Sequence, residues 1–161
     1  MTSALLFNGP VEVGLRCLVL LVEASPSALD LQRLVTMDYL LVHSGDVPGG
    51  PASLHPPGPL RAGEVAVRRG LLVEGLHLFR SRGLIVQQLS QAGIQFAADE
   101  SAAAFLDALS SRYVMNLRER AEWLFETMGR LDYRGLTDVL TESLGRWQVE
   151  FAVVATEGES V

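Results

Sequence analysis

The stretch that decides the fold runs from Leu29 to Pro57 and reads LDLQRLVTMDYLLVHSGDVPGGPASLHPP. Its first half has apolar residues at the spacing of one helix face, namely Leu31, Leu34, Val35, Leu41 and Val42. The pattern stops at Ser44-Gly45-Asp46, and the loop from 45 to 60 then holds five of the seven prolines. This predicts a helix to about His43, followed by an irregular loop. Prolines lower the entropy of the free chain, which suits an ordered binding loop, and a plain spacer remains the alternative.

The composition around this stretch is that of a globular domain. The chain has 161 residues, of which 48% are hydrophobic and 20% charged, so we expect a packed core and no wholesale disorder. All the basic residues are arginine, whose planar guanidinium suits paired contacts. The net charge of −6 argues against a nucleic-acid footprint over the whole surface, although a local patch is compatible with it.

The remaining global signals favour a cytoplasmic setting. The single cysteine, Cys17, lies in an apolar helix and is read as a small buried side chain. The N-terminus lacks the basic start and cleavage site of a signal peptide. The longest strongly apolar run, residues 17–22, is far shorter than the ~20 residues of a membrane span.

Helices are predicted on both sides of the deciding stretch. Asn8-Gly9-Pro10 marks the start of a helix to Ala24, almost wholly apolar except for a polar stripe of Glu12, Arg16 and Glu23. A third helix covers roughly 61–82 and has two apolar faces. The first contains Val65, Leu72, Leu76 and Phe79, and the second contains Val67, Leu71 and Leu78. Two such faces suggest a helix between the core and something else, which is either a partner or the C-terminal segment with Trp147 and Phe151.

Alternating residues at 84–96, with a turn at 90–93, predict a two-stranded hairpin. A helix starts at Ser101, breaks near Ser110-Ser111, and continues with an apolar face of Tyr113, Leu117, Ala121, Leu124 and Met128. The order predicts a mainly α protein with a winged helix-turn-helix-like core, a two-stranded β-hairpin wing and C-terminal helices. We expect the core at 1–110, a helical extension at 111–152 and a flexible acidic tail at 153–161.

The quoted stretch, together with Arg61, Glu64 and Arg68-Arg69, resembles the middle component of bacterial ABC-three-component conflict systems. LFRSRGLI at 78–85 and LRERAEWLFETMG at 117–129 are similar to that family too. The resemblance covers about residues 7–147. It implies a winged-helix-like adaptor that works beside an SMC/Rad50-like ABC ATPase and an effector in anti-phage defence, as in the related Lamassu systems. It implies no catalytic residues.

A search for chemistry in the sequence agrees with that. His43, His55 and His77 lack the paired spacing of zinc ligands, and His43 is expected to cap its helix as an imidazolium. His43, Ser44 and Asp38 are near in sequence, but a catalytic triad is defined by geometry. There is no phosphate-binding loop and no dinucleotide fingerprint. We therefore expect no metal, no cofactor and no enzyme activity, with an enzyme centred on His43, Ser44 and Asp46 as a remote alternative.

Two sets of residues are candidates for contact with other molecules. The partner-binding set comes from the end of the second helix, the loop that follows it, the third helix and a later tryptophan. Its members are His43, Asp46, Leu54, His55, Arg68, Arg69, Leu71, Leu78 and Trp123. Candidate nucleic-acid contacts are Arg61, Arg80, Arg82, Gln87, Gln88 and Gln91. The second set would serve a dimeric winged-helix transcription regulator, which is the main alternative to the adaptor. The sequence favours the adaptor, because the presumed reading helix is largely aliphatic.

Overall fold

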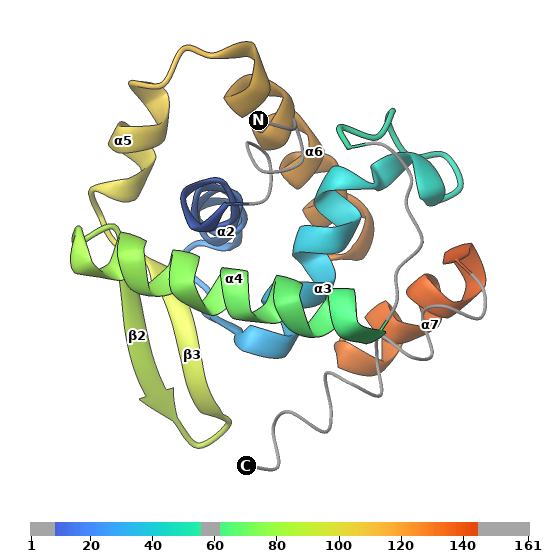
Figure 1. Ribbon diagram of the computed structural model, residues 1–161, viewed down its shortest axis with the longest axis horizontal. Helices are drawn as coiled ribbons and strands as arrows, with labels where there is room; N and C mark the ends of the chain where they lie inside the picture. The colour runs from blue at the N-terminus through green and yellow to red at the C-terminus, as the bar shows by residue number, and fades with distance from the viewer. Residues whose placement is uncertain (1–8, 56–61, 145–161) are drawn as a thin grey trace.

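The computed structural model describes residues 9–55 and 62–144. Their fold is mainly helical with a small antiparallel sheet (Figure 1). The elements in chain order are α2 (Pro10–Ala24), β1 (Leu29–Asp30), α3 (Leu31–Val42), the 3-10 helix η1 (Ser44–Asp46), α4 (Ala62–Ser81), β2 (Ile85–Ser90), β3 (Gly93–Ala98), α5 (Ala102–Asp107), α6 (Arg112–Met128) and α7 (Tyr133–Leu144). The predicted contact at Arg61, residues 56–60 of the loop, and residues 145–161 lie outside the described part of the chain.

Helix α2 is the centre of the molecule. Figure 1 views it end-on, with α4 in front and the other helices around it, and it contacts α3, α4, α5, α6 and β3. Pro10 occupies the first turn, where a missing N–H costs nothing, and Leu18, Leu20 and Leu21 are fully buried. The expected polar stripe is wrong at Arg16, which is as buried as the leucines because it pairs with Asp38 of α3.

The crossing of α2 and α4 is made close by two glycines. A Cβ on Gly75 would lie 2.6 Å from the backbone nitrogen of Gly14 and 2.7 Å from the carbonyl oxygen of Pro10. A Cβ on Gly14 would lie 2.6 Å from the ring of Phe79. The absence of side chains at both positions therefore lets the two backbones approach and seats Phe79 against α2.

The sheet has three strands in the order β1-β3-β2, one more than the predicted hairpin. β2 and β3 form the expected hairpin, with Ser90 opposite Gly93 at its turn, where Gly93 adopts a φ of +100°. β1 pairs antiparallel with β3 through Leu29 opposite Phe96. β1 was not predictable from the sequence, because this strand is two residues long and its partner strand comes more than 60 residues later.

The C-terminal helices share the same core. The predicted break lies between α5 and α6, and the Ser111 hydroxyl accepts a hydrogen bond from the backbone N–H of Val114 to start α6. The predicted apolar face of α6 is buried at Leu117, Ala121, Leu124 and Met128. Arg33 of α3 donates to the carbonyl oxygen of Gly129 at 2.8 Å, which joins the end of α6 to α3. Among the described helices, none is long and apolar enough to cross a membrane.

Candidate functional site

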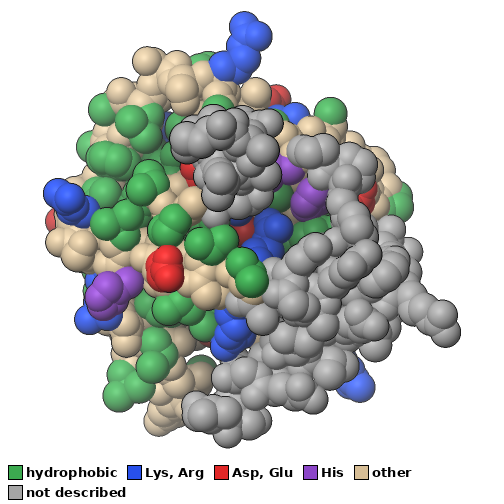
Figure 2. All heavy atoms as spheres, in the orientation of Figure 1, with side chains coloured by type: hydrophobic (Ala, Val, Ile, Leu, Met, Phe, Trp, Pro, Cys, Tyr) green, Lys and Arg blue, Asp and Glu red, His purple; other side chains and the backbone are tan. Residues whose placement is uncertain are grey.

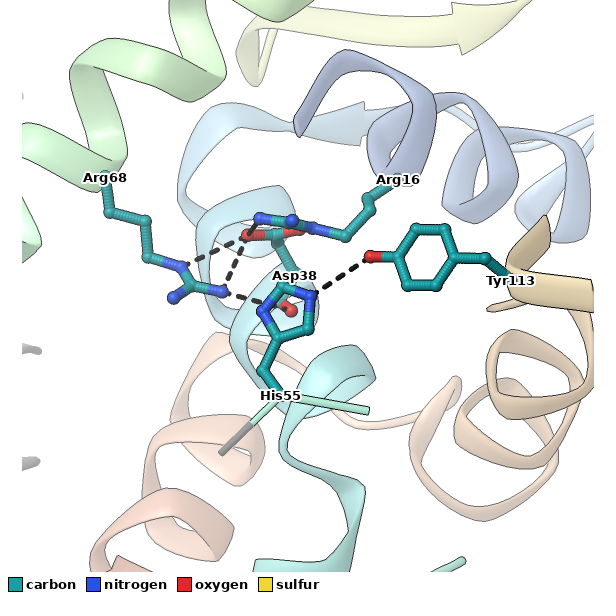
Figure 3. A network of polar contacts seen from close by, with 5 residues as sticks. All are labelled: Arg16, Asp38, His55, Arg68 and Tyr113. Carbon is teal, nitrogen blue, oxygen red and sulfur yellow. Dashed lines mark hydrogen bonds and ion pairs between the residues drawn. The ribbon is translucent and has the colours of Figure 1, made fainter. Parts of the chain in front are cut away.

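A buried ion cluster joins the three helices at the centre of the fold (Figure 3). Asp38, in the middle of α3, forms ion pairs with Arg16 of α2 and Arg68 of α4. Arg16 Nε lies 2.6 Å from Asp38 Oδ1 and its Nη2 lies 3.1 Å from Oδ2. Arg68 Nη2 lies 2.9 Å from Oδ2, with Nε at 3.1 Å. The buried carboxylate therefore accepts bonds from two guanidinium groups, one of them bidentate, and Arg68 alone of the three side chains is partly exposed to solvent.

The attraction between the Asp38 carboxylate and the two guanidinium groups offsets the cost of burial. Burial acts to raise the pKa of Asp38, but the two guanidinium groups lower it further, to about 2. For Arg16, burial acts to lower the pKa, and the neighbouring carboxylate raises it well above its usual range. Asp38 and Arg16 are therefore charged at neutral pH, and with the guanidinium of Arg68 the cluster carries one excess positive charge.

Aromatic side chains line the side of the cluster that faces the loop. The guanidinium of Arg68 lies 5.4 Å from the ring centroid of Tyr39, within the range of a cation–π contact. The Tyr39 ring lies 4.5 Å from that of His43, and its hydroxyl is 3.5 Å from the Asp46 carboxylate. Burial and then Asp46 raise the pKa of Tyr39 to about 12. Tyr39 thus stays neutral and donates toward Asp46.

The two histidines of the deciding stretch lie side by side and are almost fully enclosed. Their ring centroids are 6.3 Å apart, and His55 Nε2 is 3.1 Å from the hydroxyl of Tyr113 on α6. Burial lowers the pKa of each to about 4, with the positive charge of Arg68 next for His43 and that of Arg16 next for His55. His43 does end α3, but the expectation of an imidazolium there is wrong, because burial and the nearby arginines disfavour a further positive charge.

The loop after α3 is folded back onto the helices as far as His55. The backbone N–H groups of Leu54 and His55 both donate to the carbonyl oxygen of Val42. Arg120 of α6 donates through Nε and Nη2 to the carbonyl oxygen of Ala52, at 2.9 Å and 2.8 Å. Trp123, also on α6, lies against Gly50, so closely that a Cβ there would be 3.0 Å from its ring. This portion of the loop is therefore ordered by contacts within the chain.

The contacts of this region hold the helices and the loop together. The Ser44 hydroxyl donates to the carbonyl oxygen of Pro51 at 2.9 Å, so it is engaged with the loop backbone and not with His43. Burial raises the pKa of the Cys17 thiol well above its usual value, which keeps it protonated. No group of three or more His, Cys, Asp or Glu side chains within the described residues is placed to hold a metal ion. What the cluster does is hold α2, α3, α4 and the loop in one arrangement.

The structure separates the predicted partner-binding residues into an inner and an outer group. The inner group is His43, Leu54, His55 and Trp123, which pack in the loop contacts, and Arg68 in the ion cluster. Arg69 lies beside it and donates to Gln32 at 3.4 Å. The outer group is Leu71 and Leu78, half-buried at the edge of α4, and Asp46 on η1.

The outer face of α4 exposes both apolar and polar side chains. Val67 is 64% exposed and Val73 is 47% exposed, and Glu74 and His77, which follow Val73, are exposed as well. In the view of Figure 2, taken from the side of α4, apolar side chains spread over this helix and its surroundings with few charges among them. We call Val67, Leu71 and Leu78, which share one side of the helix, the α4 surface.

The candidate nucleic-acid contacts lie at the far end of α4 and on the hairpin. Arg80 donates to the side-chain oxygen of Gln87, which ties the end of the helix to β2. Arg82, Gln88 and Gln91 are exposed. Arg80 and Arg82 precede the hairpin. The hairpin itself, between Leu84 and Ala98, has no basic side chain.

Sequence reasoning missed the centre of the cluster. Asp38 was noted only as a neighbour of Ser44, Arg16 was assigned to solvent, and Tyr113 was read only as part of an apolar face. One signal was available: Asp38 and Arg16 are charges in strongly apolar helices, and a charge that is buried in such a helix needs a partner of opposite sign. The identity of the partner is a tertiary fact.

Comparison with known proteins gives one match. A family model described as ABC-three component (ABC-3C) system Middle Component 2 matches residues 6–150. No curated protein and no solved structure matches the chain.

Proposed function

Since the chain belongs to the middle component 2 family of ABC-three-component systems, we propose that it is a non-catalytic adaptor that docks on the SMC/Rad50-like ABC ATPase of its system. In this proposal it couples that ATPase to an effector in the cytoplasm, as part of an anti-phage defence complex of the Lamassu-related kind. Membership in a multi-component system makes it an accessory component with protein partners. The identity of those partners is our proposal.

The observation that carries the docking proposal is the α4 surface. A helix of a free-standing domain normally turns polar residues to solvent, whereas α4 exposes Val67 and half-exposes Leu71 and Leu78 along the same side. Contiguous exposed apolar surface of this kind marks interaction sites. The buried side of α4 is fixed on α2 by the glycine crossing and on α3 by the ion cluster, so the outer side is presented in one orientation.

The order of elements supports a winged-helix-like description of the core. The sequence α2, β1, α3, α4, β2, β3, with the strand order β1-β3-β2, places a hairpin directly after the third helix, as a wing requires. In this proposal α4 corresponds to the helix that other winged domains lay in DNA. Its exposed valines favour a protein partner, because a helix meant for a groove presents polar and basic side chains.

The test is a pair of matched variants assayed against the ATPase encoded beside this chain. Val67→Asp places a carboxylate on the α4 surface, and Met115→Asp places one at an equally exposed apolar position on α6 (62%). We expect Val67→Asp to weaken binding at least tenfold, since losing a buried valine contact costs roughly 1.5–3 kcal/mol. Met115→Asp should bind like wild type. Isothermal titration calorimetry measures both, and circular dichroism checks that both fold.

Equal affinity of Val67→Asp and wild type for the ATPase would reject the α4 surface as the docking site. A DNA titration at low ionic strength separates the adaptor from the dimeric winged-helix transcription regulator. The regulator must bind DNA alone and lose affinity steeply with salt, because phosphate contacts release counterions. Binding of that kind by the isolated protein would replace the adaptor proposal with the regulator.

A further inference from the structure

The outer strand of the sheet, β2, is an open edge. The opposite edge, β1, is two residues long and runs directly into α3, so it offers no template. β2 has six residues, five of them exposed, and in Figure 1 no described helix or strand lies along its outer side. Natural proteins usually protect such an edge with charge, proline or a bulge, because its free backbone groups pair readily with another strand.

The register identifies which backbone groups are free. In an antiparallel ladder, hydrogen-bonded and non-bonded residue pairs alternate. The backbone N–H of Asp99 donates to the carbonyl oxygen of Leu84, so the bonded residues of β2 are Val86, Gln88 and Ser90. The N–H and C=O groups of Ile85, Gln87 and Leu89 therefore point away from β3. Among the described residues, no helix or loop backbone is hydrogen-bonded to these three.

The hairpin itself supplies no charge or proline to protect this edge. From Gly83 to Ala98 the chain has neither a charged residue nor a proline, in a protein with a net charge of −6. At the hairpin tip, Leu89 and its cross-strand neighbour Ile94 are 84% and 52% exposed. Exposed apolar side chains beside an uncharged edge favour strand addition.

We propose that β2 pairs antiparallel with β2 of a second copy of this chain. The register that pairs all the outward groups sets Gln87 opposite Gln87 of the other copy and Ile85 opposite its Leu89. This arrangement is self-complementary around a two-fold axis, since Gln87 meets Gln87 and the exposed Leu89 of each copy lies beside the buried Ile85 of the other. The paired strands themselves carry no charge, and each Gln87 at the axis already accepts from Arg80 of its own chain. The proposal is independent of which ATPase the chain binds.

The first test is self-association measured by sedimentation equilibrium over a range of concentrations. We expect a reversible dimer, and Leu89→Lys should raise its dissociation constant about tenfold, because the axis repeats the loss of one aliphatic pair. Leu89 is largely exposed, so this variant should fold. Met115→Lys puts the same charge on an exposed site of α6 and should dimerise like wild type.

The second test locates the contact by amide hydrogen exchange followed by NMR. The amides of Val86, Gln88 and Ser90 should be protected at every concentration, and those of Ile85, Gln87 and Leu89 only when the dimer forms. A protein that stays monomeric at millimolar concentration overturns the proposal. So does a dimer that Leu89→Lys leaves intact, or protection of these amides only after the ATPase is added.

Discussion

At the residue scale, the Asp38 carboxylate is shared by two guanidinium groups that have little or no access to water. Asp38→Asn keeps the shape of the side chain and removes its charge, which leaves Arg16 and Arg68 facing each other in the core. Breaking a buried pair in this way typically costs about 3–5 kcal/mol. We expect a loss of that size in the free energy of unfolding, measured by urea denaturation at pH 7.

An exposed ion pair in the same chain supplies the control. Asp107 and Arg118 are 2.7 Å apart, with side chains 66% and 40% exposed. Asp107→Asn should change stability by less than about 1 kcal/mol, because water screens such a pair. If the two variants are equally stable, the cluster does not hold the fold together as described.

The buried histidines give stability a pH dependence with a definite sign. Burial holds the pKa of His43 and His55 at about 4 in the folded protein, against about 6.5 when unfolded. Between these values the unfolded chain binds more protons, so stability is full above pH 6.5 and falls as the pH drops toward 4. Asp38 acts in a lower window, below its usual pKa of 3.8.

We therefore expect the melting temperature to fall from pH 7.5 to pH 5, and His43→Phe to make that slope about half as steep, since one of two groups is removed. Phenylalanine keeps the ring contact with Tyr39. His77→Gln, at an exposed position on α4, should keep the wild-type slope. Differential scanning calorimetry across this range measures the three slopes, and parallel slopes for wild type and His43→Phe would contradict the assignment.

The residues of the site were predictable only in part. His43, His55, Arg68 and Trp123 stood out in the sequence, and the structure places them around one buried region. Whether these side chains face the core was not predictable, because it depends on contacts with Asp38, Arg16 and Tyr113, which lie on three different helices. Helical periodicity gives the face on which a side chain lies, and it does not say whether another element covers that face.

At the scale of elements, two glycines of α4 should respond in opposite directions to the same substitution. Gly75→Ala drives a methyl group into the backbone of α2 and should cost about 1–3 kcal/mol through overpacking. Gly70 is exposed in the same helix with nothing within 4 Å of a new Cβ, so Gly70→Ala should stabilise by about 0.5–1 kcal/mol. Urea denaturation measures both, and similar effects at the two sites would argue against the close crossing.

Several elements followed from local signals, and others did not. Pro10 and Ser111 mark helix starts that the structure has, and the Ser90–Gly93 turn is where alternation predicted it. The pairing of β1 with β3 and the hold of Arg120 on Ala52 join residues more than 60 positions apart. Contacts of that kind leave no local pattern, so the loop was read as open to a partner when its described part is fastened to α6.

At the scale of the whole molecule, the helical class, the hairpin and the family were all within reach of the sequence. Composition and helix periodicity gave the class, and the quoted stretch gave the family. The two surfaces proposed for contact, the α4 surface and the edge of β2, lie on elements that are already anchored on their inner sides. They can therefore be tested independently with exposed substitutions that leave the core untouched.

The central position of α2 has a consequence for how the chain is made. It is the first of the described helices to leave the ribosome, yet part of its burial comes from α6, which ends at Met128. At about 5–20 residues per second, roughly 100 residues of synthesis separate the two, or about 5–20 s. During that interval the almost wholly apolar α2 lacks the burial that α6 provides. We therefore expect chaperones to bind α2 in the nascent chain until α6 has been translated.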